Sequence, residues 1–366
     1  MDEETKAALI AELKVLRASY YYILIDLYGN VPLVTDFKDE SLPKQATRKE
    51  VFNFIVTEIK DNINLLSETP RGYYYGRFNK WAAHTLLAKV YLNAEIWAGE
   101  AHWQDCIDEC QAVIDFATST GEYDLEEKQK NVFITKNENS KEIIFSVGIA
   151  EGIDKYRREL YFGSKEDLGG DLGHLMRGDT YSADYFYPSK EYVDFFQVID
   201  GKSIKDNSPY FDASQAWKNR DPRFDGTFFT IMDEVVTTTG KKMNWRDEWL
   251  VNTPTGYDIQ KRGVWYGEES WTQRVDVHLM RLPRVYLHIA EAYALQANPD
   301  FEKCSEYVEK VRSRARRFAL AHPNKYIPEG LDESKVLPPF VIDSKESAME
   351  AINYESRVEF FTAVSY

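Results

Sequence analysis

The sequence predicts a mainly α-helical protein in which packed helix pairs form a scaffold and a large irregular, loop-rich region carries short strands. Apolar residues recur at helical spacing through residues 1–121 and again through 281–366. Between them, residues 122–280 are rich in Gly, Asp, Tyr and Trp and contain only short apolar runs. We expect an N-terminal helical scaffold, a loop-rich ligand-binding region and a C-terminal helical hairpin with a closing helix, all within one folded unit.

Length and composition fit a large globular protein. The 366 residues exceed the roughly 250 to 300 at which a single hydrophobic core stops growing, so a subdivided core or two lobes are expected. Hydrophobic residues make up 43% and charged residues 29%, as in ordinary soluble proteins. The 24 tyrosines and 8 tryptophans exceed what a core needs, which suggests recognition surfaces.

Net charge and cysteine content exclude several classes of protein. The formal charge of −15 repels phosphate backbones, so nucleic acid is not an expected partner. Three cysteines are too few, and odd in number, for a disulfide framework. The first residues lack the basic start and apolar run of a signal peptide, and no stretch approaches the ~20 apolar residues of a membrane-spanning helix.

The first helix is predicted from Leu9 onwards and ends near Gly29, because glycine favours a helix end and Pro32 cannot continue the helix. Its expected core stripe has Tyr20 at its centre, widened by three neighbouring tyrosines. The stripe consists of Leu9, Leu13, Leu16, Tyr20, Leu24 and Leu27, and the widening residues are Tyr21, Tyr22 and Tyr28.

Three further helices are predicted before residue 121. Thr47 and Glu50 have the spacing of a capping box and begin a helix whose apolar stripe is Val51, Ile55, Ile59 and Ile63. The stretch 79–97 is rich in Ala and Leu and predicts a third helix with close packing. A fourth follows Gly99, with these residues pointing inward: Trp103, Ile107, Cys110 and Ile114.

The C-terminal part predicts a helical hairpin and a final helix. Residues around Tyr286–Tyr293 mark one helix, Asn298-Pro299-Asp300 a turn, and Phe301–Phe318 the antiparallel partner. The final helix is expected over Lys345–Phe361. The helix pairs resemble tetratricopeptide units, although their spacing is irregular and no strict repeat is present.

The middle region is too long to serve only as a connection. Its apolar runs EIIFSVGI and GTFFTI predict short strands, and the rest predicts loops. Loops of this length in a compact protein usually carry function, so we expect the binding site here.

The stretch 244–271 is the strongest candidate for ligand binding. It contains six aromatic residues among Gly and charged residues, without helical periodicity. Flat aromatic faces suit the C–H faces of sugars, and planar polar groups suit their hydroxyls. The alternative is that these rings attach long loops to the scaffold. The candidate residues are Trp245, Trp249, Tyr257, Trp265, Tyr266 and Trp271, with Asn244, Arg246 and Asp247 as polar neighbours.

The stretch RGYYYGRF, residues 71–78, forms a second aromatic patch. Three adjacent tyrosines, Tyr73, Tyr74 and Tyr75, cannot all face one side of an extended segment. At least one is expected to face solvent or ligand, and Tyr74 is the candidate for glycan contact. Packing against the scaffold is the favoured role for the others.

Other motifs are interpreted as structural. His102, Cys106 and Cys110 fall at i, i+4 steps, but a structural zinc normally needs four ligands, so buried thiols are expected and no metal site. In NRDPRFDG, Asp221 begins a turn at Pro222 that Arg223 is expected to hold by a salt bridge or carbonyl contacts. The remaining basic run is expected to form a solvated or ion-paired helix face: Arg312, Arg314, Arg316 and Arg317.

The sequence contains no motif for catalysis. It has no GxSxG elbow, HExxH, phosphate-binding loop or dinucleotide fingerprint, and among 60 acidic residues no pair is singled out for glycoside hydrolysis. We therefore expect a binding protein that is not an enzyme and uses no cofactor.

Six segments, in order across nearly the whole chain, resemble the SusD/RagB family of outer-membrane lipoproteins of Bacteroidetes. They are LRASYYYILIDLYGNVPLVT, FNKWAAHTLLAKVYLNA, NRDPRF, RLPRVYLHIAEAYA, VRSRAR and AINYESRVEFF. The resemblance implies a tetratricopeptide-like scaffold and a cell-surface glycan-binding protein, anchored at the outer membrane, that covers a SusC-type TonB-dependent transporter.

Two departures from that family stand out. Family members begin with a signal peptide and a lipidated cysteine, which do not precede Met1, and ESRVEFF is followed by TAVSY instead of the family's acidic-Gly-Arg and Asp-Leu-Arg segment. The resemblance thus implies that both ends are truncated. Membrane contact is then expected only through an N-terminal lipid anchor absent from this chain.

Two other functions stay open at this point. A helical glycoside hydrolase or lyase would line a cleft with the same aromatic residues and an acid pair. A helical-repeat scaffold could instead bind a peptide or protein. The identity of the glycan does not follow from the sequence, because aromatic platforms accept many sugars.

Overall fold

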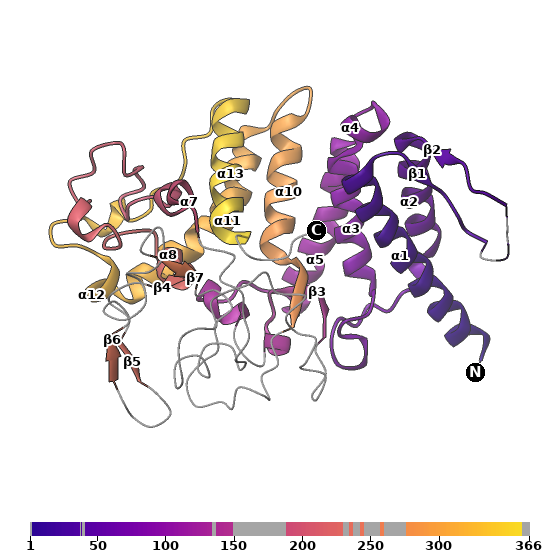
Figure 1. Ribbon diagram of the computed structural model, residues 1–366, viewed down its shortest axis with the longest axis horizontal. Coiled ribbons are helices and arrows are strands. Elements are labelled where there is room, and N and C mark those ends of the chain that lie inside the picture. Colours follow the sequence, from indigo (N-terminus) through magenta and orange to yellow (C-terminus); the bar gives the residue numbers. More distant parts are fainter. Residues whose placement is uncertain are drawn as a thin grey trace.

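The computed structural model describes residues 2–36, 38, 41–133, 137–148, 188–229, 234–236, 242–244, 257–259 and 276–360. The protein is mostly helical with a few short strands, as the sequence predicts. In Figure 1 the N-terminal helices lie at one end of the molecule, the C-terminal helices stand next to them, and the short strands β4–β7 lie towards the opposite end. Among the described residues, no helix combines the length and the apolar character needed to cross a membrane.

The N-terminal part begins with two packed helices, α1 (Glu3–Tyr28) and α2 (Arg48–Asn62). Asp2 caps α1 by accepting a 2.7 Å hydrogen bond from the Thr5 backbone N–H. Gly29 ends the helix at φ 75°, a conformation that favours glycine. In the sequence between these helices, strands β1 (Val31–Pro32) and β2 (Gln45–Ala46) pair with each other. The predicted capping box at Thr47 is present at the start of α2.

The predicted core stripe of α1 is wrong in part. Leu13 and Tyr20 are 65% and 60% exposed, Leu27 and Tyr28 are also exposed, and the other predicted stripe residues are only half-buried. Every face of α1 carries apolar residues, so periodicity alone does not select the buried one. Small residues permit the close packing on that face. The buried residues are Ala11, Val15, Ala18, Tyr21, Tyr22 and Ile25.

The next helices are α3 (Lys80–Leu92), α4 (Ala94–Ala98) and α5 (Trp103–Thr120). The stretch predicted as one helix over 79–97 is thus two helices with a break at Asn93, whose side chain donates a 2.9 Å hydrogen bond to the Lys89 carbonyl. The inward residues predicted for α5 are confirmed, except that Trp103 is only half-buried.

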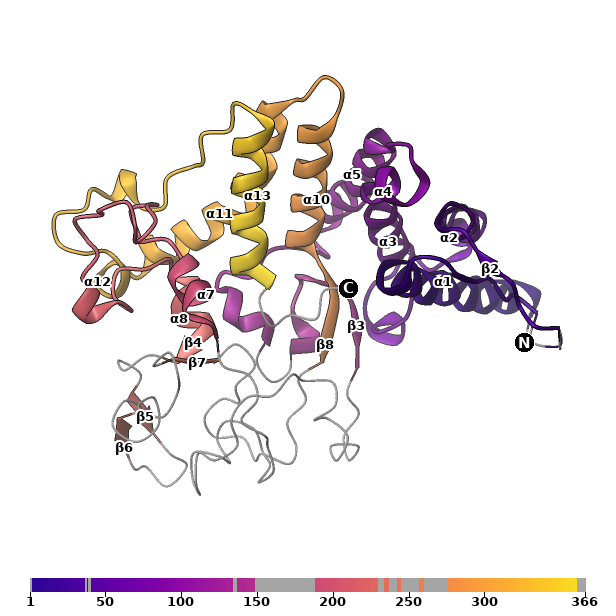
Figure 2. The ribbon, with the colours of Figure 1, turned by 45° about the horizontal axis from the view of Figure 1, so that its top comes forward.

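The C-terminal part consists of α10 (Leu282–Leu295), α11 (Phe301–Ala321), the short α12 (Pro323–Tyr326) and α13 (Lys345–Phe360). The predicted hairpin is α10 with α11, and α13 packs against both. Because α10 also packs against α5, the largest hydrophobic core contains side chains from both helical parts. Figure 2 shows α10 between α13 on one side and α5 on the other.

The middle region is built of short elements. Strand β3 (Ile143–Val147) pairs antiparallel with β8 (Val277–Arg281), and both views place this ladder beneath α10 (Figure 1, Figure 2). Two helices, α7 (Lys190–Phe195) and α8 (Arg223–Thr227), pack near α13. The remaining pairs are β4 (Phe228–Phe229) with β7 (Asp258–Ile259) and β5 (Glu234–Val236) with β6 (Lys242–Asn244). Both runs predicted to contain strands therefore do so.

Candidate functional site

A buried ionic network connects the middle region to the C-terminal helices. Arg223, at the start of α8, contacts Asp221 at 2.7 Å and Glu355 of α13 at 2.5 Å. Arg314 of α11 contacts Glu142, which precedes β3, at 2.9 Å. Every member is at most 3% exposed, and positive and negative residues are equal in number. The members are Arg223, Arg281, Arg312, Arg314, Asp221, Glu142, Glu355 and Glu359.

Burial and the neighbouring arginines shift the pKa values of two network carboxylates in opposite directions. Burial alone would raise the pKa of Asp221, but the charge and hydrogen bonds of Arg223 hold that pKa below its usual value. For Glu142 the effect of burial is larger than the opposing effect of Arg314 and Arg281, so its pKa is raised. Removing one member would leave a buried charge without its partner, so the network acts as a structural unit.

The network explains two sequence motifs. Arg223 holds the Asp221 turn by a salt bridge, as predicted. The run on α11 was predicted to be solvated or ion-paired: Arg316 pairs with Glu309 and Arg317 is exposed, while Arg312 and Arg314 are ion-paired but buried. No local sequence pattern marked the buried partners Glu142, Glu355 and Glu359, because each lies far along the chain from the arginines that it contacts.

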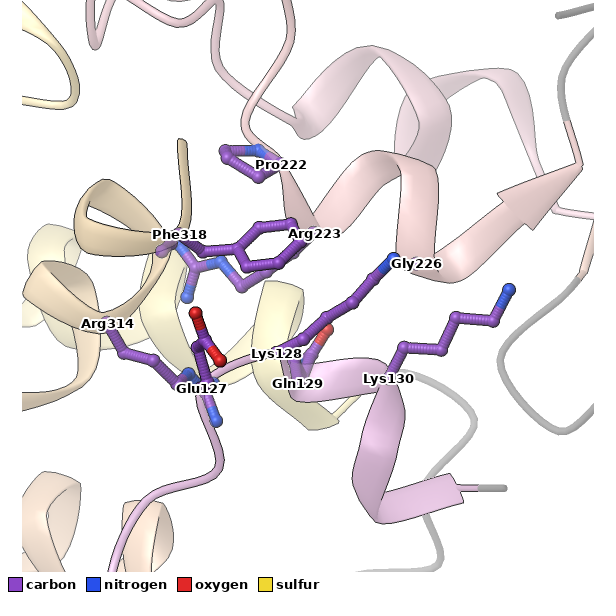
Figure 3. A pocket seen from close by; sticks show the side chains of 10 residues that line it. Glu127, Lys128, Gln129, Lys130, Pro222, Arg223, Gly226, Arg314 and Phe318 are labelled. Carbon is purple, nitrogen blue, oxygen red and sulfur yellow. The ribbon is translucent and has the colours of Figure 1, made fainter. Parts of the chain in front are cut away.

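A small pocket lies against this network (Figure 3). Lys128 extends across it towards Gly226, with its Nζ 5.2 Å from the Phe318 ring centroid. Gln129 donates to the backbone carbonyls of Val358 and Glu359 at 3.2 and 2.9 Å. The pocket is lined by Glu127, Lys128, Gln129, Lys130, Pro222, Arg223, Gly226, Arg314, Ala315 and Phe318. None of the ligand-binding residues predicted from the sequence lines it, and its guanidinium groups already pair with the network carboxylates.

The tyrosine patch is built on a short 3₁₀ turn over Gly72–Tyr74. Tyr73 is 77% exposed, and its ring lies edge-on to Tyr74 with the centroids 5.3 Å apart. The Arg77 guanidinium lies 4.5 Å from the Tyr73 centroid and 5.4 Å from that of Tyr74. The segment is therefore a turn instead of the extended chain assumed from the sequence, and Tyr73 is its most exposed ring.

The third tyrosine fixes this turn to the β3–β8 ladder. The Tyr75 hydroxyl donates a 2.7 Å hydrogen bond to Asp276 Oδ2, and burial raises the pKa of Tyr75. Asp276 in turn donates its backbone N–H to Asn137 at 2.9 Å. A Cβ added at Gly76 would lie 3.4 Å from the Ser146 carbonyl, so the turn also closely approaches β3. The exposed rings consequently lie on a base of fixed geometry.

Most of the predicted binding residues fall outside the described part of the chain. They are Trp245, Trp249, Trp265, Tyr266, Trp271 and Arg246. The backbone of Asn244 is described, ends β6 and pairs with Glu234. Tyr74 is half-buried beside Tyr73. The glycan contacts assigned to these residues stay predictions.

Tyr257 is the one aromatic residue of 244–271 whose side-chain contacts the structure describes. Its ring is half-buried and edge-on to Phe224, with centroids 5.7 Å apart, and lies 6.1 Å from Phe228. Burial raises the pKa of its hydroxyl. These contacts attach the loop to α8 and β4, which is the packing role considered as the alternative from the sequence. Ligand contact by its open edge stays a prediction.

The cysteines are buried and free, which confirms the packing role expected for Cys106 and Cys110. A hydrogen bond with Cys110, together with burial, raises the pKa of Cys106. His102 instead contacts Asp105 at 2.8 Å. Within the described residues, no three His, Cys, Asp or Glu side chains form a group that could hold a metal ion.

Comparisons with known proteins identify relatives over both parts of the chain. A model of the SusD family matches residues 141–362, and a second model, described as starch-binding associating with outer membrane, matches residues 1–92. The SusD-like protein P25 of Formosa agariphila is 22% identical over 91% of this chain and 60% of its own length. The starch-binding protein SusD of Bacteroides thetaiotaomicron is 27% identical over 42% of this chain and 27% of its own.

Solved structures agree on the fold. A SusD-like carbohydrate binding protein from Bacteroides fragilis superimposes with a TM-score of 0.72 at 18% identity, over 99% of this chain and 66% of its own. The chain covers only part of its relatives, and it spans about 60% of the length of the Formosa protein. Since the first family model covers more than half of the residues, the chain belongs to the SusD family.

Proposed function

We propose that this protein binds oligosaccharides at the cell surface of the outer membrane and delivers them to a SusC-type TonB-dependent transporter, without chemical conversion. Membership of the SusD family carries the proposal, because the family model extends over residues 141–362 and so includes the aromatic stretch 244–271. The description of the second family model, with starch binding and outer-membrane association, supports the ligand class and the location.

The described residues support a binding role for 244–271 by fixing its surroundings. Asn244 ends β6, Tyr257 packs against Phe224, and Asp276 begins the approach to β8. A segment held at Tyr257 and followed by the fixed Asp276 loses less conformational freedom when it binds a ligand. Indole faces would then stack on sugar C–H faces, while Asn244, Arg246 and Asp247 would bond the hydroxyls.

A triple variant tests the site. We expect Trp245→Ala/Trp265→Ala/Trp271→Ala to lose binding to a polysaccharide that the unchanged protein binds, measured by native affinity electrophoresis and then titration calorimetry. The panel is soluble starch, laminarin, xylan and galactomannan. Tyr28→Ala is the matched control, because Tyr28 is an exposed aromatic on α1. Unchanged affinity in the triple variant, with circular dichroism like that of the parent, would exclude this site.

Two further measurements test the rest of the proposal. Incubation with each polysaccharide should release no new reducing ends, whereas their appearance would support the glycosidase or lyase alternative. Co-expression with a SusC-type transporter should allow copurification from outer membranes. If the protein instead binds peptides and no polysaccharide in the panel, the assigned ligand class is wrong.

A further inference from the structure

We propose that Tyr73, with Tyr74 beside it, forms a second sugar-binding platform that lies outside the stretch 244–271 and stacks on a pyranose ring of an uncharged oligosaccharide. This inference rests on the proposed function and adds a subsite to it. We call Tyr73, Tyr74, Arg77 and Glu12 together the platform.

The exposed ring of Tyr73 is held in place by its neighbours. Arg77 donates two hydrogen bonds to Glu12 of α1, from Nε at 2.9 Å and from Nη2 at 2.8 Å. The same guanidinium faces the ring of Tyr73 at 4.5 Å. A paired arginine has few alternative positions, so it restricts the ring that it contacts. Tyr73 therefore presents most of its surface to solvent in one arrangement, which reduces the entropy lost on binding.

Other exposed tyrosines of the protein lack the support that Tyr73 has. Tyr20 and Tyr28 are also exposed, at 60% and 70%, but both lie on the regular surface of α1. In the part of the chain that the structure describes, neither side chain has a hydrogen bond, ring contact or cation–π contact. Single exposed aromatics are common on protein surfaces and need no function. Among these three tyrosines, only Tyr73 has a ring that other side chains contact.

The platform lies near the residues that follow the aromatic stretch 244–271. Tyr75, next to the platform, bonds Asp276, and Asp276 follows Trp271 by only five residues in the sequence. Gly76 closely approaches the Ser146 carbonyl of β3. The platform therefore lies beside the β3–β8 ladder, and β8 begins six residues after Trp271 in the sequence. One extended oligosaccharide could contact both, which would add their binding energies within a single ligand.

The platform carries no net charge. The Glu12 carboxylate neutralises Arg77, so the platform has no net charge to attract or repel an ionic ligand. The exposed groups are an aromatic face and a phenolic hydroxyl, with the edge of an arginine–carboxylate pair beside them. A neutral sugar offers matching C–H faces and hydroxyls. An acidic polysaccharide would gain no ionic contact here.

The test compares point variants on a polysaccharide of the panel that retards the wild-type protein in an affinity gel. We expect Tyr73→Ala to weaken binding by about three- to tenfold in calorimetry, while Tyr73→Phe keeps the ring and the affinity. Tyr28→Ala should leave binding unchanged. Arg77→Ala, which frees the ring, should weaken binding less than Tyr73→Ala.

A footprint separates direct contact from indirect effects. N-acetylimidazole acetylates exposed tyrosines, and mass spectrometry reports each site. Bound polysaccharide should protect Tyr73 and leave Tyr28 reactive in the same sample. Equal affinity of Tyr73→Ala and wild type, or equal labelling of Tyr73 with and without polysaccharide, overturns the platform and leaves the proposed function intact. Alginate, an acidic polysaccharide, is tested beside the panel. A wild-type protein retarded neither by the panel nor by alginate contradicts both proposals, and retardation by alginate alone overturns the uncharged ligand.

Discussion

Arg223 Nη1 lies 2.5 Å from Glu355 Oε2, and this buried pair joins the middle region to the last helix of the chain. The two residues are 132 positions apart in the sequence. Arg223 also bonds Asp221 within its own turn. The loop-rich region is thus attached to α13 by charge as well as by apolar packing.

Arg223→Ala should lower the free energy of unfolding by about 3–5 kcal/mol, because it leaves Asp221 and Glu355 buried without their shared cation. Urea unfolding followed by circular dichroism measures the change. Arg317→Ala is the control, since Arg317 is exposed and should matter by about 0.5 kcal/mol or less. Equal losses in the two variants would show that the network does not stabilise the fold.

Lys89 should make stability depend on pH in the alkaline range. Burial and the nearby charge of Arg284 lower the pKa of Lys89 from 10.5 to about 7, against an opposing effect of Asp26. Its ammonium also lies 4.8 Å from the Tyr22 ring centroid. The unfolded chain therefore binds the proton more tightly than the folded one. Between pH about 7 and 10.5 the free energy of unfolding should rise with pH from this group.

Lys89→Met removes that titration. We expect the variant to be more stable than wild type below pH 7, with the difference decreasing as pH rises towards 10.5. Urea unfolding at a series of pH values measures it, and Lys60→Met serves as the control at an exposed lysine of α2. A difference between Lys89→Met and wild type that does not change with pH would contradict the lowered pKa.

The sequence predicted the helices well because their caps and apolar spacing are local signals. The capping box at Thr47 and the turn at Asn298-Pro299 are examples. It did not identify the buried face of α1, where Leu13 is exposed and Ala11 buried. Hydrophobicity ranks leucine above alanine, but close packing of helices favours the smaller side chain.

The ionic network shows a second limit. Arg314 lies 172 positions from Glu142 along the chain, so no local pattern links them. Arginine is mostly a surface residue, and the run of arginines therefore predicted a solvated or ion-paired face without indicating that two of its ion pairs are buried. For the candidate site, local reasoning gave the tyrosine patch but selected Tyr74. Tyr73 is the more exposed ring, and it contacts Arg77, which pairs with Glu12 from a distant helix.

Tyr257 should contribute more to stability than to ligand binding. Its contribution to stability should come from the packing of its ring and not from its hydroxyl. Tyr257→Ala removes a half-buried ring from contact with Phe224 and should cost roughly 2 kcal/mol, less than for a fully buried aromatic. Tyr257→Phe keeps the packing and should unfold like wild type. Thermal unfolding of the two variants measures this. Equal destabilisation by both would assign the effect to the hydroxyl group.

Tyr75 and Asp276 should be energetically coupled, because their side chains share a 2.7 Å hydrogen bond in a part-buried setting. Tyr75→Phe removes the donor and should cost about 1–2 kcal/mol, and Asp276→Ala removes the acceptor. In a double-mutant cycle by urea unfolding, the double variant should cost less than the sum of the single variants by about 0.5–2 kcal/mol. Strict additivity would mean that the bond contributes nothing. In polysaccharide titrations, Tyr75→Phe should weaken binding less than Tyr73→Ala, because it shifts the base of the platform while the stacking ring remains.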